Sequence, residues 1–153
     1  MAMTMAGSVT LPADRATVWE ALNDPAVLKR SIPGCQELDR SEDGGFTATA
    51  KVSIGPVKAT FKGKVMLSDI DPPNGYTISG EGQGGVAGFA KGGARVRLED
   101  AEAGGTVLGY DVEAQVGGKI AQLGGRLING VAKKYADEFF ANFAKALEPE
   151  PAA

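Results

Sequence analysis

The first residues alternate between apolar and polar side chains, which predicts a strand. Over residues 3–11, apolar or small residues occupy every second position, and threonines and a serine fill most of the others. A period of two is typical of a strand with one buried face. Pro12 interrupts the alternation, and we expect the strand to end there.

Two short helices are predicted after this strand. Asp14 is suited to cap the first of them, because its carboxylate can accept a hydrogen bond from a free backbone amide. Asp24 is followed by Pro25, which combines a capping residue with proline at the first helical position. We therefore expect a second helix through Arg30, ended by Pro33 and Gly34.

The period of two then continues through most of residues 35–116. Turn-forming residues interrupt it at residues 55–56 and 71–75, where proline, asparagine and glycine favour tight turns. We expect strands over residues 46–54, 57–67, 76–83, 89–98 and approximately 106–116, with a bulge at Gly92 and Gly93. Consecutive strands joined by tight turns indicate an antiparallel meander.

The period changes to that of a helix over residues 119–147. Apolar residues recur at intervals of three or four from Ile120 to Leu147, which predicts one long amphipathic helix. Gly124, Gly125 and Gly130 each weaken such a helix by about 1 kcal/mol relative to alanine. They mark either a soft segment beside the mouth of a cavity or a close approach of the helix to the sheet.

The order of these elements predicts an α+β fold. An antiparallel sheet can leave one face in water but must cover the other, and the C-terminal helix is the only predicted element long enough to do so. We expect a helix-grip fold: a curved antiparallel β-sheet wrapped around the long C-terminal α-helix, with two short helices after the first strand. Residues 1–147 are expected to form a single domain, and residues 148–153, EPEPAA, a disordered tail.

Composition excludes several classes of function. The 153 residues suit one domain, and a formal net charge of −3 offers no general attraction to nucleic acid. The chain has no histidine and one cysteine, Cys35, so no metal site or cofactor is predicted. No apolar run is long enough to span a bilayer, and the N-terminus lacks the features of a signal peptide. The protein is therefore expected to be cytoplasmic.

A glycine-rich motif at residues 80–85 satisfies the pattern G-x-G-x-x-G of dinucleotide-binding proteins. That pattern binds a pyrophosphate only when a helix begins at the third glycine. The residues that follow here are those of a strand, and Gly118-Lys119 lacks the serine or threonine that a phosphate-binding loop needs. Nucleotide binding is not expected.

Glycine is the one residue in excess, with 22 residues, about twice the usual share. Gly63, Gly80 and Gly82 lie on the same predicted face as Phe61 and Tyr76. Glycines facing the helix can leave a cavity, or they can mark bends where the sheet coils. If a cavity exists, the predicted lining is apolar with two phenols: Ile54, Phe61, Tyr76, Gly80, Gly82, Phe89, Tyr110, Leu123, Leu127 and Val131. For each of these residues alone, core packing is the alternative role.

A row of lysines projects from the opposite, outer face of two strands: Lys51, Lys58, Lys62 and Lys64, with Arg95 and Arg97 nearby. Such a row can dock on anionic lipid or on an acidic partner, or it can simply be a solvated face.

The sequence argues against catalysis. No histidine is present, no aspartate or glutamate falls on the apolar face, and Asp111 and Glu113 alternate outward. Tyrosine, with an ordinary pKa of about 10, is a poor base at neutral pH.

Four segments, at residues 18–35, 54–65, 80–94 and 116–134, resemble the G-subunit family of carbon monoxide dehydrogenase. That family is similar to the START-like, or polyketide cyclase-like (SRPBCC), proteins with the helix-grip fold, and the resemblance extends over approximately residues 5–145. It implies a non-catalytic accessory protein of a molybdenum-containing hydroxylase of the carbon monoxide dehydrogenase type. Family membership also implies a role in bringing that enzyme to the inner face of the cytoplasmic membrane and coupling it to quinones.

Three hypotheses follow. The protein carries a lipophilic, quinone-like molecule in a cavity between sheet and helix and presents it to the hydroxylase. Alternatively, it is a recruitment or assembly factor with a closed core, which docks through the lysine face. A third alternative is a small cyclase- or dehydratase-like enzyme that uses Tyr76 or Tyr110.

Overall fold

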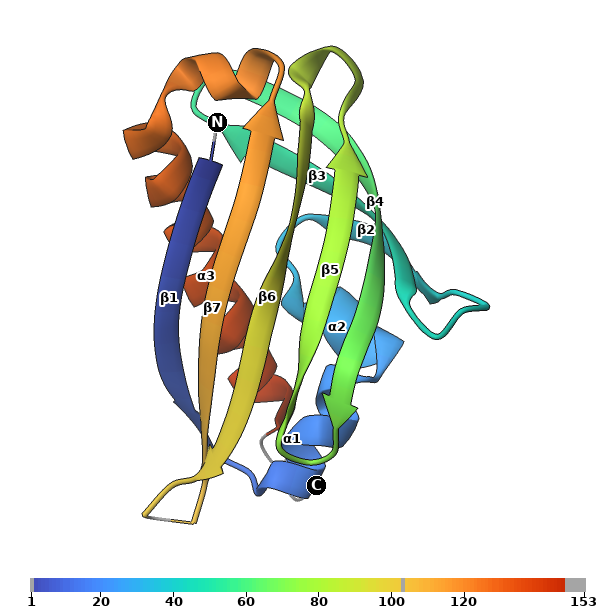
Figure 1. The fold of residues 1–153 in the computed structure, drawn as a ribbon, viewed down its shortest axis with the longest axis vertical. Coiled ribbons are helices and arrows are strands. Elements are labelled where there is room, and N and C mark those ends of the chain that lie inside the picture. The colour runs from blue at the N-terminus through green and yellow to red at the C-terminus, as the bar shows by residue number, and fades with distance from the viewer. Residues whose placement is uncertain (1, 103, 148–153) are drawn as a thin grey trace, which may run out of the picture.

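The computed structural model describes residues 2–102 and 104–147. Figure 1 shows a curved sheet with α3 lying along one of its faces. The predicted tail at residues 148–153 lies outside the described residues. The elements in chain order are β1 (Ala2–Leu11), α1 (Arg15–Leu22), α2 (Pro25–Ser31), β2 (Cys35–Arg40), β3 (Phe46–Ile54), β4 (Val57–Asp71), β5 (Gly75–Gln83), the 3-10 helix η1 (Gly85–Ala87), β6 (Phe89–Asp100), β7 (Thr106–Gly117), the 3-10 helix η2 (Lys119–Leu123) and α3 (Gly125–Leu147).

The seven strands form one antiparallel sheet in the order β1-β7-β6-β5-β4-β3-β2. The sequence-based prediction of a curved antiparallel sheet gripping a long helix is thereby confirmed. The N-terminal strand pairs with the last one, so β1 and β2 are the two edges although they are close in sequence.

The predicted bulge at Gly92 and Gly93 is wrong. Both residues pair with β5 and β7 in unbroken register, and the register shifts lie instead between Cys35 and Glu37 and between Ser68 and Asp71. A Cβ on Gly92 would collide with the carbonyl oxygen of Glu113 on β7. This glycine therefore accommodates a close approach of neighbouring strands.

The two short helices begin where their capping residues predict. The Asp14 carboxylate accepts a hydrogen bond from the Thr17 amide at 2.9 Å, and the Asp24 carboxylate accepts one from the Ala26 amide at 2.9 Å. Hydrogen bonding by Thr17 lowers the pKa of Asp14. Pro25 occupies the first helical position of α2.

The predicted helix over residues 119–147 is broken, so the expectation of one continuous helix is wrong. Gly124 has a φ of +92°, which ends η2 and lets α3 begin in a new direction at Gly125. A Cβ on Gly124 or on Gly130 would meet no heavy atom within 4 Å. Close approach of the helix to the sheet therefore does not explain either glycine.

Two apolar clusters hold α3 and its neighbours against the sheet. The first contains Phe143, which is fully buried, together with core residues of α1, α2 and strands β1, β5, β6 and β7. The second, referred to below as the second cluster, contains Ala87, Val116, Ile120 and Ile128. An amide of Asn142 on α3 also donates to the carbonyl of Ser31 at 3.2 Å, which ties α3 to the end of α2.

Gly88 provides a test of the connection between η1 and β7. Its φ is +119°, and a Cβ there would collide with the carbonyl oxygen of Gly117. We expect Gly88→Ala to lower the free energy of unfolding by more than about 2 kcal/mol in urea denaturation. Gly85→Ala is the control, because its φ is +62° but its Cβ would meet nothing, and about 1 kcal/mol is expected. Equal losses in the two variants would contradict this account.

Candidate ligand-binding cavity

A cavity of about 310 Å³ lies between the inner face of the sheet and the helices. Each of the seven strands and each of the three α-helices contributes at least one lining residue, and Ile32, which directly follows α2, contributes another. The lining consists of Met5, Leu22, Leu28, Ile32, Leu38, Phe46, Ala48, Val65, Leu67, Tyr76, Ile78, Ala94, Val96, Leu108, Tyr110, Val112, Ala136, Phe139 and Phe140. Among the described lining residues, the two tyrosines alone carry a side-chain oxygen or nitrogen, and the lining surface is almost entirely apolar, so the cavity is suited to an apolar ligand.

The cavity exists because small side chains face it from three directions. Ala48 lies on β3, Ala94 on β6 and Ala136 on α3. Protein interiors are ordinarily filled to the density of organic crystals, and larger residues at these positions would fill this one. The cavity therefore depends on small residues at a few inward-facing positions.

Aromatic rings surround the cavity and fix its shape. The ring of Tyr76 meets the ring of Trp19 edge-on, with centroids 5.2 Å apart. Tyr110 stacks on Phe140 with centroids 5.3 Å apart, and Phe140 in turn packs edge-on against Phe139. Trp19, the only tryptophan, thus lies directly behind one wall of the cavity.

The two phenol groups have no hydrogen-bond partner among residues 2–102 and 104–147. By contrast, the hydroxyl oxygen of Tyr135 accepts a hydrogen bond from the amide of Ser53 at 3.0 Å. Tyr76 is only 4% exposed, and burial raises its pKa well above the ordinary value. The Tyr76 phenol therefore stays protonated at neutral pH and remains able to donate a hydrogen bond.

Gly7 makes room for the second phenol. It pairs with Tyr110 across β1 and β7, and a Cβ at this position would lie 2.5 Å from the hydroxyl oxygen of Tyr110. A side chain there would push the phenol away from its present position.

The structure places two of the ten residues predicted to line a cavity, Tyr76 and Tyr110, on its surface. Ile54 and Phe61 instead pack against the second cluster. A Cβ on Gly80 would lie 3.3 Å from a methyl carbon of Val65, so no open space faces that glycine. The cavity is therefore nearer to α1 and α2 than predicted.

The remaining predicted residues lie near the other end of the sheet. A Cβ on Gly82 would lie 3.8 Å from the ring of Phe61, and Phe89 is 40% exposed. Leu123, Leu127 and Val131 line a surface groove beside the start of α3, together with Arg126, Gly130 and Lys134. The break at Gly124 separates Leu123 from α3. Leu127 and Val131 lie in the first turns of α3, whereas the α3 residues that line the cavity begin at Ala136.

Sequence reasoning missed the contributions of Leu22, Leu28 and Ile32. Leu22 and Leu28 belong to the two short helices, and Ile32 directly follows the second. The packing of these helices against the open side of the sheet has no signal in the local pattern. Phe139 lies on the predicted apolar stripe of the last helix, so its inward orientation was available from the spacing alone.

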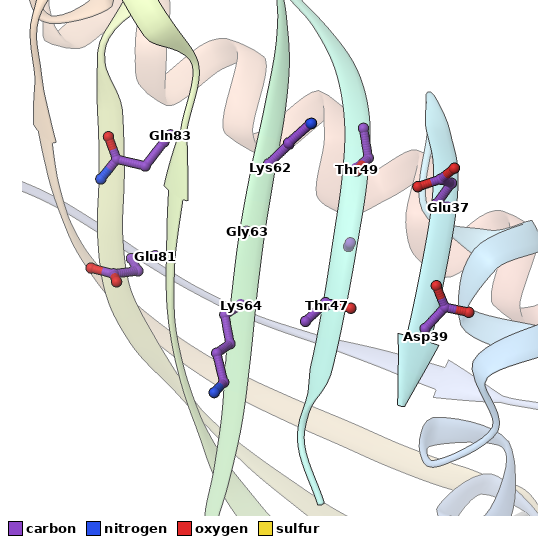
Figure 2. Close-up of a pocket in the computed structure, with 10 residues that line it drawn as sticks. Glu37, Asp39, Thr47, Thr49, Lys62, Gly63, Lys64, Glu81 and Gln83 are labelled. Carbon is purple, nitrogen blue, oxygen red and sulfur yellow. The ribbon is translucent and has the colours of Figure 1, made fainter. Parts of the chain in front are cut away.

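The predicted docking lysines fall into two groups. Figure 2 shows Lys62 and Lys64 on the outer face of the sheet, in a depression that also contains Glu37, Asp39 and Glu81. Lys64 forms an ion pair with Asp43 at 2.8 Å, and this hydrogen-bonded contact lowers the pKa of Asp43 to about 2. The other two lysines, Lys51 and Lys58, lie near the β3–β4 turn and form no ion pair with any described residue. Arg95 and Arg97 do not lie beside these lysines, as was expected. They lie opposite Thr77 and Gly75, near the β4–β5 turn, and form ion pairs with Asp69 and Asp111 at 4.0 and 2.6 Å.

No group of three or more histidine, cysteine, aspartate or glutamate side chains within residues 2–102 and 104–147 is arranged to hold a metal ion. In the same part of the chain, no helix is both long and apolar enough to cross a membrane. The motif at residues 80–85 lies at the end of β5 and is followed by η1 and β6, without the helix that a dinucleotide site requires.

Comparison with known proteins identifies the family. The family model of CoxG, the G subunit of carbon monoxide dehydrogenase, matches residues 7–148. The chain belongs to the CoxG family. This confirms the resemblance seen in the sequence. A search of proteins with curated descriptions found no significant match.

Solved structures place this CoxG-family protein among helix-grip folds. A conserved protein from Geobacillus kaustophilus is 33% identical, with a TM-score of 0.88 and 95% of each chain covered. The ZhuI aromatase/cyclase from Streptomyces sp. R1128 is 15% identical, with a TM-score of 0.68, 96% of this chain and 94% of that chain covered. A protein from Rhizobium leguminosarum is 16% identical, with a TM-score of 0.71 and coverage of 96% and 95%. The last two likenesses show the fold alone.

The buried phenol of Tyr76 predicts a pH dependence of stability. Because its pKa is raised in the folded state, the stability it contributes is complete below about pH 10 and is lost as the pH rises further. We expect Tyr76→Phe to reduce this alkaline loss, and to change stability little at pH 7, since the hydroxyl has no partner in the described chain. The measurement is urea denaturation between pH 7 and 11.

Tyr135→Phe is the control for this prediction. It removes the hydroxyl that contacts Ser53, so about 1 kcal/mol is expected to be lost at pH 7. An unchanged alkaline transition in Tyr76→Phe would contradict the assignment.

Proposed function

We propose that this CoxG-family protein is a non-catalytic accessory protein that carries a flat, lipophilic, quinone-like molecule in the 310 Å³ cavity. It presents that molecule to a molybdenum hydroxylase of the carbon monoxide dehydrogenase type, in the cytoplasm at the inner face of the membrane. The observation that carries the proposal is an apolar cavity with two phenols that have no partner among the described residues.

The size of the cavity supports a ligand with a ring system. An apolar cavity of about 150 Å³ in another protein holds benzene. A space of about 310 Å³ is twice as large, which suits two fused rings or one ring with substituents. A long apolar tail would have to leave the cavity.

The polar groups of the cavity match an acceptor ligand. A quinone has two carbonyl oxygens and no hydrogen-bond donor on its ring. Tyr76 and Tyr110 each offer one hydroxyl donor, and the burial of Tyr76 keeps it protonated. An apolar ring therefore loses no hydrogen bond on entering, while its carbonyls can gain partners.

The family supports the choice of partner. Membership of the CoxG family implies association with carbon monoxide dehydrogenase or with a related hydroxylase. The lipophilic ligand supplies a reason for the association, since a quinone can accept the electrons that such an enzyme releases.

The absence of catalysis is part of the proposal. Among the described residues, the side chains that line the cavity include no carboxylate, amine, guanidinium or thiol. Burial raises the pKa of Tyr76 further from neutrality, so even less of it than of an ordinary tyrosine is ionised and able to act as a general base at neutral pH. The cavity also favours the carrier over an assembly factor with a closed core, because that alternative requires a filled interior.

The cavity can be filled by one substitution. We expect Ala136→Leu to weaken the binding of menadione, a naphthoquinone, by roughly tenfold or more, because the added carbons occupy the ligand's space. Quenching of Trp19 fluorescence is the measurement, since its ring contacts Tyr76. Ala141→Leu on the exposed side of α3 is the matched control and should bind normally.

Mass spectrometry of organic extracts of the purified protein then tests for a co-purified isoprenoid quinone. Absence of any quinone binding by the parent protein would refute the carrier.

The phenols provide a second test, which also addresses the enzyme alternative suggested by the aromatase/cyclase of similar fold. For a carrier, Tyr76→Phe and Tyr110→Phe should each weaken menadione binding by about three- to tenfold, the value of one hydrogen bond. An enzyme of the cyclase type would instead lose turnover of a polyketide-like substrate with little change in binding. Measuring both quantities for the two variants decides between these alternatives.

A further inference from the structure

Three segments that are distant in sequence meet at one end of the molecule, at the top of Figure 1. They are residues 51–58 around the β3–β4 turn, residues 84–89 around η1, and residues 117–134, which contain η2 and the start of α3. Ala87 and Ile120, from two of these segments, belong to the second cluster, and Ile54, from the third, packs against it. We call these three segments the tip.

The tip exposes large apolar side chains. Val86 is 93% exposed, Phe89 40% and Leu127 37%. Val86 therefore contributes almost nothing to the core. Isolated apolar residues on a surface are ordinary, but several at one end indicate a contact surface.

The tip is also uniformly basic. It contains no aspartate or glutamate, so all 19 acidic residues of the chain lie outside it. Its six cations are Lys51, Lys58, Lys119, Arg126, Lys133 and Lys134. The net charge of −3 for the whole chain thus hides a strong separation of charge.

The basic side chains of the tip are free to meet an external anion. Lys133 pairs with Asp137 at 3.1 Å, but the other five cations form no ion pair with any described residue. Elsewhere, Arg15 pairs with Asp100 and Lys64 with Asp43, both at 2.8 Å.

The loop that carries Val86 is suited to an environment with little water. Residues 84–89, Gly-Gly-Val-Ala-Gly-Phe, have no polar side chain. Several of its backbone groups are paired within the loop: the amide of Gly84 donates to the carbonyl of Gly88 at 2.8 Å, and that of Ala87 to Gly84 at 3.2 Å. Backbone groups that are already paired lower the cost of entering a lipid interface.

We propose that the tip is the surface by which the protein binds an anionic lipid bilayer. Val86 and Phe89 enter the boundary between headgroups and acyl chains, and the surrounding lysines and arginine meet the lipid phosphates. Physiological salt screens charges beyond about 8 Å, so the bilayer interacts with the basic tip more than with the acidic remainder. This proposal rests on the proposed function, in which a lipophilic ligand is exchanged with the membrane.

An acidic protein surface is the competing partner, and the η1 loop favours lipid over it. Binding of an acidic protein surface would need only the cations of the tip and not the exposed apolar loop. A loop of glycine, alanine, valine and phenylalanine at the apex offers such a partner no hydrogen-bonding side chain, whereas it suits a fluid apolar layer.

The tip also lies in line with the cavity. Met5 lines the cavity, and Met3, two residues earlier on the same face of β1, packs against the second cluster. Apolar side chains thus continue along the inner face of β1 from the cavity toward the tip.

The test is co-flotation of the full chain with vesicles. Parent protein should float with vesicles of phosphatidylcholine and phosphatidylglycerol (7:3), and should bind weakly to phosphatidylcholine alone or in high salt. We expect Val86→Glu to lower partitioning by roughly tenfold. A triple variant, Lys58→Gln, Lys119→Gln and Arg126→Gln, should lower it on the order of 100-fold.

Matched controls make the same changes away from the tip. Ile70→Glu alters another exposed apolar residue, 53% exposed near the far end of β4, and should float normally. Lys29→Gln, Arg30→Gln and Lys145→Gln remove three charges from α2 and the end of α3. This control triple should retain most of the binding.

The two proposals fail separately. Menadione quenching of Trp19 should be unchanged in the tip variants, which shows that they are folded and loaded normally. No flotation of the parent protein, or equal losses in tip and control variants, would overturn the membrane surface while leaving the carrier intact. Flotation without quinone binding would overturn the carrier and not the assignment of the tip to lipid.

Discussion

The inner face of a seven-stranded antiparallel sheet has to be removed from water, and α3 is the one long helix of the described chain that can cover it. A straight helix cannot fill a concave surface of this width with its own side chains. The sheet therefore curves, and α1 and α2 close the side that α3 leaves open. Phe143 anchors α3 at full burial, and the hydrogen bond from Asn142 to Ser31 joins the helices that enclose the space. What remains uncovered by side chains is the cavity, so it is a direct outcome of how the sheet is covered.

Much of this architecture was predictable from the sequence, because it depends on local periods and on turn residues. The period of two predicted the strands, Asp24 followed by Pro25 predicted the start of α2, and the need to cover one face predicted the grip around the last helix. Glycine caused the errors. Gly92 lies where neighbouring strands approach closely, whereas Gly124 supplies a positive φ that breaks a helix. The same residue type fills both structural roles, and the period of apolar residues does not tell which role a given glycine has.

The position of the cavity was less predictable, for a related reason. Tyr76 and Tyr110 were identified because strand alternation assigns them to the inner face. Leu22 and Leu28 reach the cavity only through the packing of two short helices against a distant part of the sheet. Leu123 was expected inside because a continuous helix would have carried it there, and Leu127 because the period of the helix does not tell which of its turns face the cavity. Contacts between elements, not patterns within them, determine which apolar residues surround the space.

An apolar space that water does not fill leaves the atoms around it without contact partners on one side. The core therefore lacks part of the van der Waals contact that a filled interior would have, and an apolar molecule of fitting size would supply it. Because binding to the folded state alone raises the free energy of unfolding, an apolar molecule bound in this cavity would raise the melting temperature as its occupancy rises.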